Sequence, residues 1–194
     1  MKTLEQEIEN FKNSSITAAK EIMYENDGKM NPFMTVLALE NGKYKTGVLP
    51  VPKEMLADPR ALAMALPTLI TILQLKEQTE VKAFSFIAHA NMAVIHKDPD
   101  APEPTEEEVK NTKKKDVLIT YLSTPGKNFC PLYIYEVTKT GKKVNKYGDL
   151  VDEFELIEDL TTMTKINEDG SAKETSPFSE VWTNVEKLLK NEEN

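Results

Sequence analysis

The first fifty residues change from a helical to a strand pattern of apolar positions. Residues 4–22 carry apolar or small side chains at steps of three and four, which indicates one face of an amphipathic helix: Leu4, Ile8, Phe11, Ser15, Ala18 and Ile22. Gly28 should end this helix, because glycine accepts the left-handed conformation in which helices stop. Residues 33–40 and 44–51 predict two strands joined by Asn41-Gly42, a strong signal for a tight hairpin turn.

A second helix is predicted from Asp58 onward, since an aspartate followed by Pro59 has the form of an N-cap and a first helical residue. Its apolar residues lie on nearly every side: Leu62, Leu66, Leu69, Ile70 and Leu73. A helix that is apolar all round is normally buried, so we expect this to be the most buried helix. Pro67 lacks an amide hydrogen and should kink the helix or split it in two.

Residues 81–96 predict a long strand with two different faces. The even positions form an apolar face: Phe84, Phe86, Ala88, Ala90, Met92 and Val94. The odd positions mix small, polar and apolar groups: Ser85, Ile87, His89, Asn91 and Ala93. Residues 97–115 contain three prolines and blocks of charge, which indicate an exposed loop whose charged part covers 98–115.

Two further strands are predicted at residues 116–123 and 131–139, around a Pro125-Gly126 turn. The apolar spacing of residues 154–163 favours a helix, although the segment 149–157 fits the start of a strand equally well. Residues 178–190 carry a clean helical stripe: Phe178, Val181, Trp182, Val185, Leu188 and Leu189.

An isolated helix of this length is marginal in water, so something must cover the stripe around Trp182. One alternative is the sheet of the same domain. The other is a partner protein, in which case Trp182, Val185 and Leu189 are the partner-binding residues.

The order helix, two strands, helix, three strands and one or two helices predicts an α+β protein, an antiparallel sheet of about five strands with helices packed on it. This order resembles that of profilin-like and roadblock or longin domains, whose members mostly bind partners. We expect residues 1–150 to form the core domain, which includes the loop at 98–115. Residues 151–194 should form an acidic helical extension packed on that core.

Charge is segregated along the chain of 194 residues, whose formal net charge is −8. The first 148 residues have a net charge of +1, whereas residues 149–194 have a net charge of −9. Residues 110–148 are rich in lysine, which favours either electrostatic attraction of a partner or docking of the acidic tail on this basic segment. Arg60 is the single arginine among 24 basic residues, which argues against sequence-specific nucleic-acid binding as the main role.

Several functional classes lose support from the sequence. It contains no glycine-rich phosphate loop, no dinucleotide fingerprint, no nucleophile elbow and no HExxH or EF-hand pattern, so we expect no cofactor and no metal. Cys130 is the single cysteine, which excludes an internal disulfide. The charged N-terminus and the absence of a long apolar run favour the cytoplasm and argue against a membrane.

The best candidates for chemistry are His89, Asn91 and Cys130. In a catalytic interpretation, His89 is a general base, Asn91 orients its ring and Cys130 is the nucleophile. The structural alternative makes His89 a hydrogen-bonded histidine beside Asn91 and makes Cys130 a small buried apolar residue. His96 lies seven residues after His89 in the same predicted strand, so the two rings should point to opposite faces and not share a metal.

One segment resembles a family of small uncharacterised proteins of tailed bacteriophages and prophages. The matching residues are the pair Lys115-Asp116, the apolar strand 117–122 and the strand end Tyr135-Glu136-Val137. The resemblance covers ~40 residues, or ~55 with the HANMAVI segment at 89–95. It implies a phage protein that acts in the host cytoplasm or in the particle and has no known enzymatic role.

These observations lead to three hypotheses. The first is a non-enzymatic α+β protein that works by binding a protein partner or by self-association. The second is an enzyme with a dispersed site around His89, Asn91 and Ser85. The third is an acidic nucleic-acid mimic or inhibitor, based on the acidic C-terminal segment.

Overall fold

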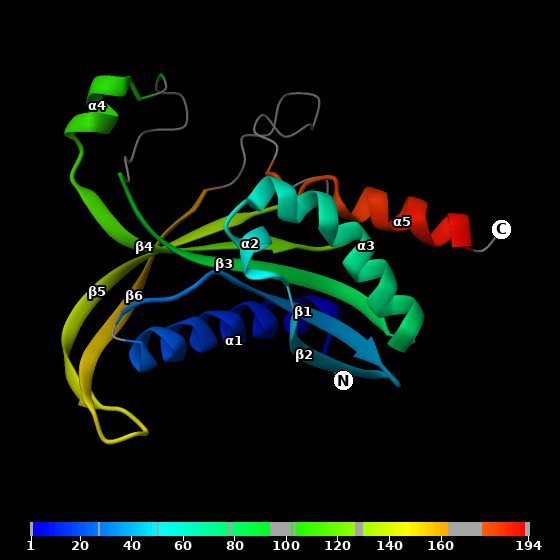
Figure 1. Ribbon diagram of the computed structural model, residues 1–194, viewed down its shortest axis with the longest axis horizontal. Helices are drawn as coiled ribbons and strands as arrows, with labels where there is room; N and C mark the ends of the chain where they lie inside the picture. Colours follow the sequence, from blue (N-terminus) through cyan, green and yellow to red (C-terminus); the bar gives the residue numbers. More distant parts are fainter. Residues whose placement is uncertain are drawn as a thin grey trace.

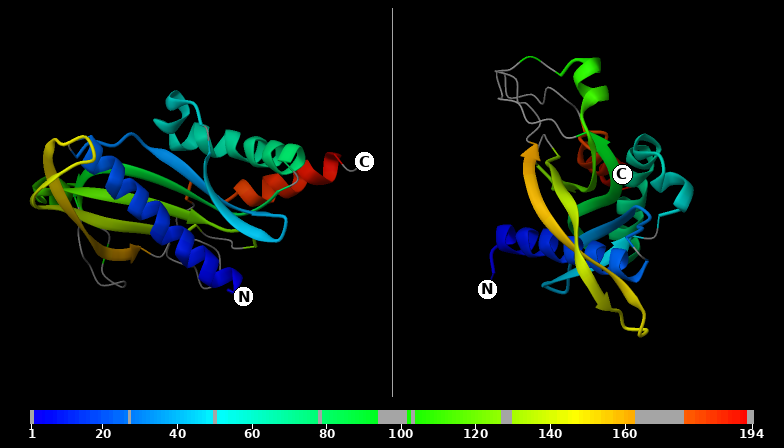
Figure 2. Two further views of the ribbon diagram at one scale, coloured as in Figure 1. Left: turned by 90° about the horizontal axis from the view of Figure 1, so that it is seen from below. Right: turned by 90° about the vertical axis from the view of Figure 1, so that its left-hand side faces the viewer.

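The computed structural model describes residues 2–26, 28–49, 51–77, 79–93, 102, 104–126, 130–162 and 176–192. The fold is α+β, as predicted, and consists of three layers (Figure 1). A single antiparallel sheet forms the middle layer. Helix α1 (Leu4–Glu25) covers one face, and helices α2 (Lys53–Leu56), α3 (Pro59–Glu77) and α5 (Val181–Glu192) lie on the other (Figure 2).

The sheet has six strands in the order β2-β1-β3-β4-β5-β6, and every neighbouring pair is antiparallel. The strands are β1 (Phe33–Glu40), β2 (Lys43–Leu49), β3 (Glu80–Ala93), β4 (Lys114–Ser123), β5 (Leu132–Val144) and β6 (Leu150–Thr162). Strand β3 lies inside the sheet and pairs with both β1 and β4. The prediction of about five strands was therefore one strand short.

Local sequence signals for turns and caps are confirmed. Asn41 and Gly42 have φ of 49° and 74°, the left-handed geometry of a tight hairpin turn. Gly28 has φ of 79°, and its amide donates to the carbonyl of Met23 at 2.8 Å at the end of α1. The Asp58 carboxylate accepts hydrogen bonds from the amides of Arg60 and Ala61 at the start of α3.

The two faces of strand β3 pack into different clusters of buried side chains. Phe84 and Phe86 pack among Leu62, Leu66 and Ile70 of α3, as the apolar even face predicted. On the opposite face Ile87 packs under α1. The even positions of β3 thus face α3 and α5, and the odd positions face α1.

The C-terminal helix docks on its own sheet. Trp182 and Val185 of α5 are buried in the same cluster as Phe84, and the indole Nε1 of Trp182 donates to the Ser123 hydroxyl at 3.0 Å. The ring of Phe178, just before α5, contacts the rings of Phe84, Phe86 and Tyr121. Burial of this aromatic group covers most of the apolar stripe, which is the first of the two predicted alternatives.

The helix predicted at residues 154–163 is wrong, because residues Leu150–Thr162 form strand β6. Strand β6 pairs along its whole length with β5, so the segment predicted as a helical extension begins with a strand of the same sheet. Phe154 and Leu156 pack on α1, and this separation of two fits the strand period. The predicted helix does not form, because hydrogen bonds to β5 satisfy the backbone N–H and C=O groups of this segment.

The predicted loop at 98–115 also needs correction. Residues Glu106–Asn111 form the short helix α4, and β4 already begins at Lys114. Thr105 accepts a hydrogen bond from the amide of Glu108, whose carboxylate in turn accepts from the amide of Thr105. This capping box stabilises a helix within a charged segment. Residues 97–101 and 103 of the predicted loop, and His96, lie outside the described residues.

Candidate functional site

The structure separates the three residues of the predicted catalytic arrangement. His89 and Asn91 project from the odd face of β3, on the side of α1, whereas Cys130 belongs to the core cluster under α3 and α5. Asn91 donates through Nδ2 to the carboxylate of Asp116 at 2.9 Å. The sheet therefore lies between His89 and Cys130, which cannot act together as base and nucleophile.

Cys130 is a buried thiol with 1% exposure. Burial raises its pKa to about 12, although hydrogen bonds to the Ser176 and Ser123 side chains act in the opposite direction. A thiol with this pKa stays protonated at neutral pH and is a poor nucleophile. Cys130 is therefore the small buried residue of the structural alternative.

Three buried polar atoms on the α1 side have no hydrogen-bond partner among the described residues: Nε2 of His89, Oγ of Ser85 and Oγ1 of Thr120. Thr120 of β4 lies opposite Ile87, the residue of β3 that is midway between Ser85 and His89. The predicted hydrogen-bonded histidine is thus not observed at Nε2. Unpaired polar groups lower the stability of this face.

The predicted partner-binding residues lie in the protein's own core. Trp182 and Val185 are buried, and Leu189 packs partly buried against the same cluster. A partner could reach this stripe only if α5 left the sheet. Trp182 and Val185 therefore offer no exposed surface to a partner while α5 is docked on the sheet.

Helix α3 carries an apolar surface that its own fold leaves open. Its inner residues Leu62 and Leu66 are buried, but Met64, Ile72 and Leu75 on the outside are 83%, 44% and 51% exposed. These three residues follow helical spacing and form one stripe, which also contains the exposed Thr68. We refer to Met64, Thr68, Ile72 and Leu75 as the α3 face.

The α3 face is also free of charge. Arg60 and Lys76 are the charged residues between Pro59 and Lys76, and no acidic residue occurs there. The neighbouring helix α5 has an ordinary exposed side, with Glu186, Lys187 and Lys190 in solvent. Helix α3 has the predicted buried side, with Leu62, Leu66 and Ile70 at 0% exposure, and it also has an exposed outer side. Pro67, moreover, does not split α3 in two.

No metal site and no membrane-spanning segment emerges from the described part of the chain. No group of three or more His, Cys, Asp or Glu side chains among those residues could hold a metal ion. No helix there is long and apolar enough to cross a membrane.

No protein-family model, curated protein or solved structure matches the chain. The case for a function therefore depends on the surfaces of the molecule itself. Among these, the α3 face combines a sequence signal, a helix that is apolar all round, with direct exposure in the fold.

Proposed function

We propose that the protein acts by protein–protein association without catalysis, and that the α3 face is its docking surface for a second copy of the same chain. The observation that carries this proposal is the exposure of Met64, Ile72 and Leu75 on one stripe of α3, whose charged residues, Arg60, Lys76 and Glu77, lie near the two ends of the helix. Apolar residues at helical spacing on a surface helix are typical of helix-mediated association.

Charge favours a second copy as the occupant. Two chains of net charge −8 repel each other over most of their surfaces, but the α3 face contains no acidic residue. Two copies can therefore meet there without burying like charges. Thr68, a smaller residue near the middle of the stripe, allows two helices to cross closely, and the flexible Met64 side chain can adjust to its partner.

Three large apolar side chains per copy make a small interface, so we expect a weak dimer whose population rises with concentration. Sedimentation velocity over a wide range of protein concentration measures this directly. In the variant Met64→Glu, a carboxylate meets its counterpart in a two-fold pair, and we expect a monomer at every concentration.

The matched control is Thr183→Glu, which introduces the same charge at an exposed position of the adjacent helix α5 and should leave the dimer unchanged. Far-ultraviolet circular dichroism checks that both variants are folded. A wild-type protein that stays monomeric, or a dimer that tolerates Met64→Glu, would contradict the proposal.

We also propose that the protein acts in the cytoplasm of a phage-infected host or as part of a phage particle. The support is the resemblance of the segment from Lys115 to Val137 to phage proteins, together with the single cysteine, Cys130. The genes beside the coding sequence test this setting. Neighbouring genes for phage structural or host-modulating proteins would support it, whereas a set of host metabolic genes would argue against it.

A further inference from the structure

Strands β5 and β6 extend beyond the rest of the sheet as a two-stranded arm. The last pair between β4 and β5 joins Val117 to Glu136, and beyond this point β5 pairs with β6 alone as far as Val144 and Leu150. The end of this arm lies near the C-terminal end of α1 and far from α3 (Figures 1 and 2). We refer to residues 142–150 as the hairpin tip.

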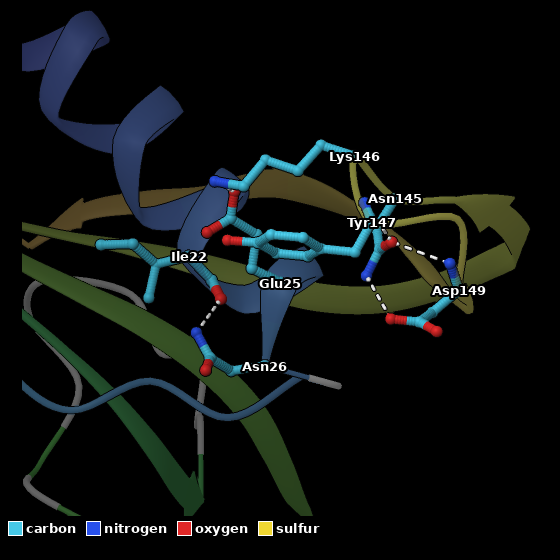
Figure 3. Close-up of polar contacts among 7 residues, drawn as sticks. All are labelled: Ile22, Glu25, Asn26, Asn145, Lys146, Tyr147 and Asp149. Carbon is cyan, nitrogen blue, oxygen red and sulfur yellow. Dashed lines mark hydrogen bonds and ion pairs between the residues drawn. The ribbon is translucent and has the colours of Figure 1, made fainter.

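The turn of the hairpin tip is tied together by one asparagine. The Asn145 side-chain oxygen accepts hydrogen bonds from the amides of Tyr147 and Asp149, both at 2.9 Å. The Asn145 side chain contacts both the amide and the carboxylate of Asp149 (Figure 3). The backbone amide of Asn145 donates to the carbonyl of Asp149, and Gly148 has φ of 90°. These bonds fix the backbone that presents the exposed side chains.

Helix α1 holds the arm from the side. The ammonium group of Lys146 forms an ion pair with Glu25 in the last turn of α1 (Figure 3). Lys143 places its Nζ 3.4 Å from the centre of the Tyr24 ring, and the Tyr24 hydroxyl donates to the carbonyl of Phe154 at 2.8 Å. The hairpin tip is therefore positioned before any partner arrives, which lowers the entropy cost of binding.

This supported tip exposes apolar side chains. Val144 and Leu150 lie directly opposite each other and are 65% and 64% exposed, and Tyr147 in the turn is 70% exposed. Val144 and Leu150 add little to the stability of the fold, since both side chains remain largely in water, whereas the Tyr147 ring has the ammonium group of Lys146 5.1 Å from its centre. Such a group, held at the end of a projecting arm, is suited to contact with another molecule.

The charge around the tip is positive in a chain that is acidic overall. Lys142, Lys143 and Lys146 lie within the tip, with Asp149 as its single acidic residue. Lys142 is exposed and forms no ion pair with a described residue. The tip therefore offers positive charge around an apolar centre.

The geometry points to an acidic protein segment as the ligand of the hairpin tip, namely one in which apolar side chains are flanked by carboxylates. Carboxylates complement Lys142, which forms no ion pair with a described residue, and an apolar side chain can cover Val144 and Leu150. This inference is independent of association through the α3 face, because the two surfaces lie far apart and can be occupied together (Figure 1).

A nucleic acid fits the tip less well. The arm has no arginine, and Tyr147 is the single aromatic residue among the strongly exposed large side chains of the described residues. The aliphatic side chains of Val144 and Leu150 cannot form hydrogen bonds with a phosphate. An anionic membrane is disfavoured by the net charge of −8, which opposes approach of the whole molecule.

The test uses fluorescence anisotropy with short labelled peptides. One peptide carries two leucines among aspartates and glutamates, a second replaces the leucines by serine, and a third replaces the acids by lysine. Oligodeoxythymidine and phosphatidylserine vesicles are the other two probes. We expect the acidic leucine peptide to bind best, and we expect its binding to weaken as salt is added.

Two tip variants locate the contact. Val144→Ser with Leu150→Ser should weaken peptide binding by about tenfold or more through loss of apolar contact. Lys142→Gln should weaken binding less and reduce its dependence on salt. The matched controls, Val48→Ser on β2 and Lys187→Gln on α5, should bind like the wild type. The same titration with the Met64→Glu variant, which should not associate through α3, shows whether peptide binding depends on that association.

The inference is overturned if the acidic leucine peptide fails to bind, if the tip variants bind it like the wild type, or if oligodeoxythymidine or the vesicles bind more tightly than it does. Each variant alters an exposed side chain, so unchanged Trp182 emission is expected and confirms that the core is intact.

Discussion

At the scale of single residues, the buried thiol of Cys130 links stability to pH. Its pKa is raised from 9.0 to about 12, mainly by burial, so the folded protein keeps the proton that the unfolded chain loses above pH 9.0. The stabilisation is therefore complete below pH 9.0 and is lost as the pH rises towards about 12.

We expect the stability of the wild type to fall more steeply above pH 9.0 than that of Cys130→Ala, which has no thiol to ionise. Urea unfolding of both proteins at neutral and at alkaline pH measures the difference. The lysines and tyrosines titrate in both proteins, so their effects cancel in the comparison. Parallel pH profiles for the two proteins would show that Cys130 ionises freely in the folded state.

At the scale of elements, the end of α1 depends on Gly28. A Cβ atom at this position would lie 2.8 Å from Cζ of Phe154 in β6, and φ is +79°. Gly126 has a similar φ of +73°, but a Cβ atom there would have no atom of the described residues within 4 Å. The two glycines therefore share a backbone requirement, and only Gly28 has a steric one as well.

We expect Gly126→Ala to lower the free energy of unfolding by about 1–2 kcal/mol, the cost of a left-handed alanine. Gly28→Ala should cost more, because Phe154 must also move away from the end of α1. Chemical denaturation of the two variants gives the comparison. Equal losses would mean that the Phe154 ring moves aside without strain.

At the scale of the whole molecule, the two helical layers differ in how well they satisfy their buried groups. Three buried polar atoms without a partner among the described residues lie beneath α1, on Ser85, His89 and Thr120, whereas α3 has one, Oγ1 of Thr71. The layer with α3 and α5 has a cluster rich in aliphatic and aromatic side chains. Each buried polar group without a partner costs about 1–3 kcal/mol, so the α1 layer should open first.

Hydrogen exchange resolved by segment tests this difference. We expect the amides in the middle of α1 to exchange before those of α3, although α1 is the longer helix. Replacing Ser85 by alanine removes a buried hydroxyl and should slow exchange in α1. Exchange from α3 before α1 would place the weaker layer on the opposite face.

The outcome for individual elements shows which parts of the fold were accessible from sequence. The Asn41-Gly42 turn, the Asp58 cap and the two faces of β3 were predicted correctly, because each depends on residues close together in the chain. Residues 154–162 were misassigned, because their strand state depends on pairing with β5, which the apolar spacing of the segment does not encode.

The candidate surfaces were harder to predict than the elements. The apolar character of α3 was visible in the sequence, but the exposure of Met64 and Ile72 follows from the absence of a further layer outside α3 in the described structure. No pattern in the sequence marks Val144 and Leu150, which are single apolar residues at the two ends of a lysine-containing turn. Their significance depends on cross-strand pairing, which places them side by side at the end of an arm.

The sequence by itself determined the fold class, the turns, the caps and the apolar stripe of α5, because local propensity and periodicity act within a few residues of each other. Only the tertiary structure decided that β6 joins the sheet, that the sheet separates His89 from Cys130, and that Trp182 lies inside while Met64 lies outside. The physical reason is that burial is a property of layers. A helix presents its apolar residues in the same way whether or not another layer covers them, and only the packed molecule determines which side remains in water.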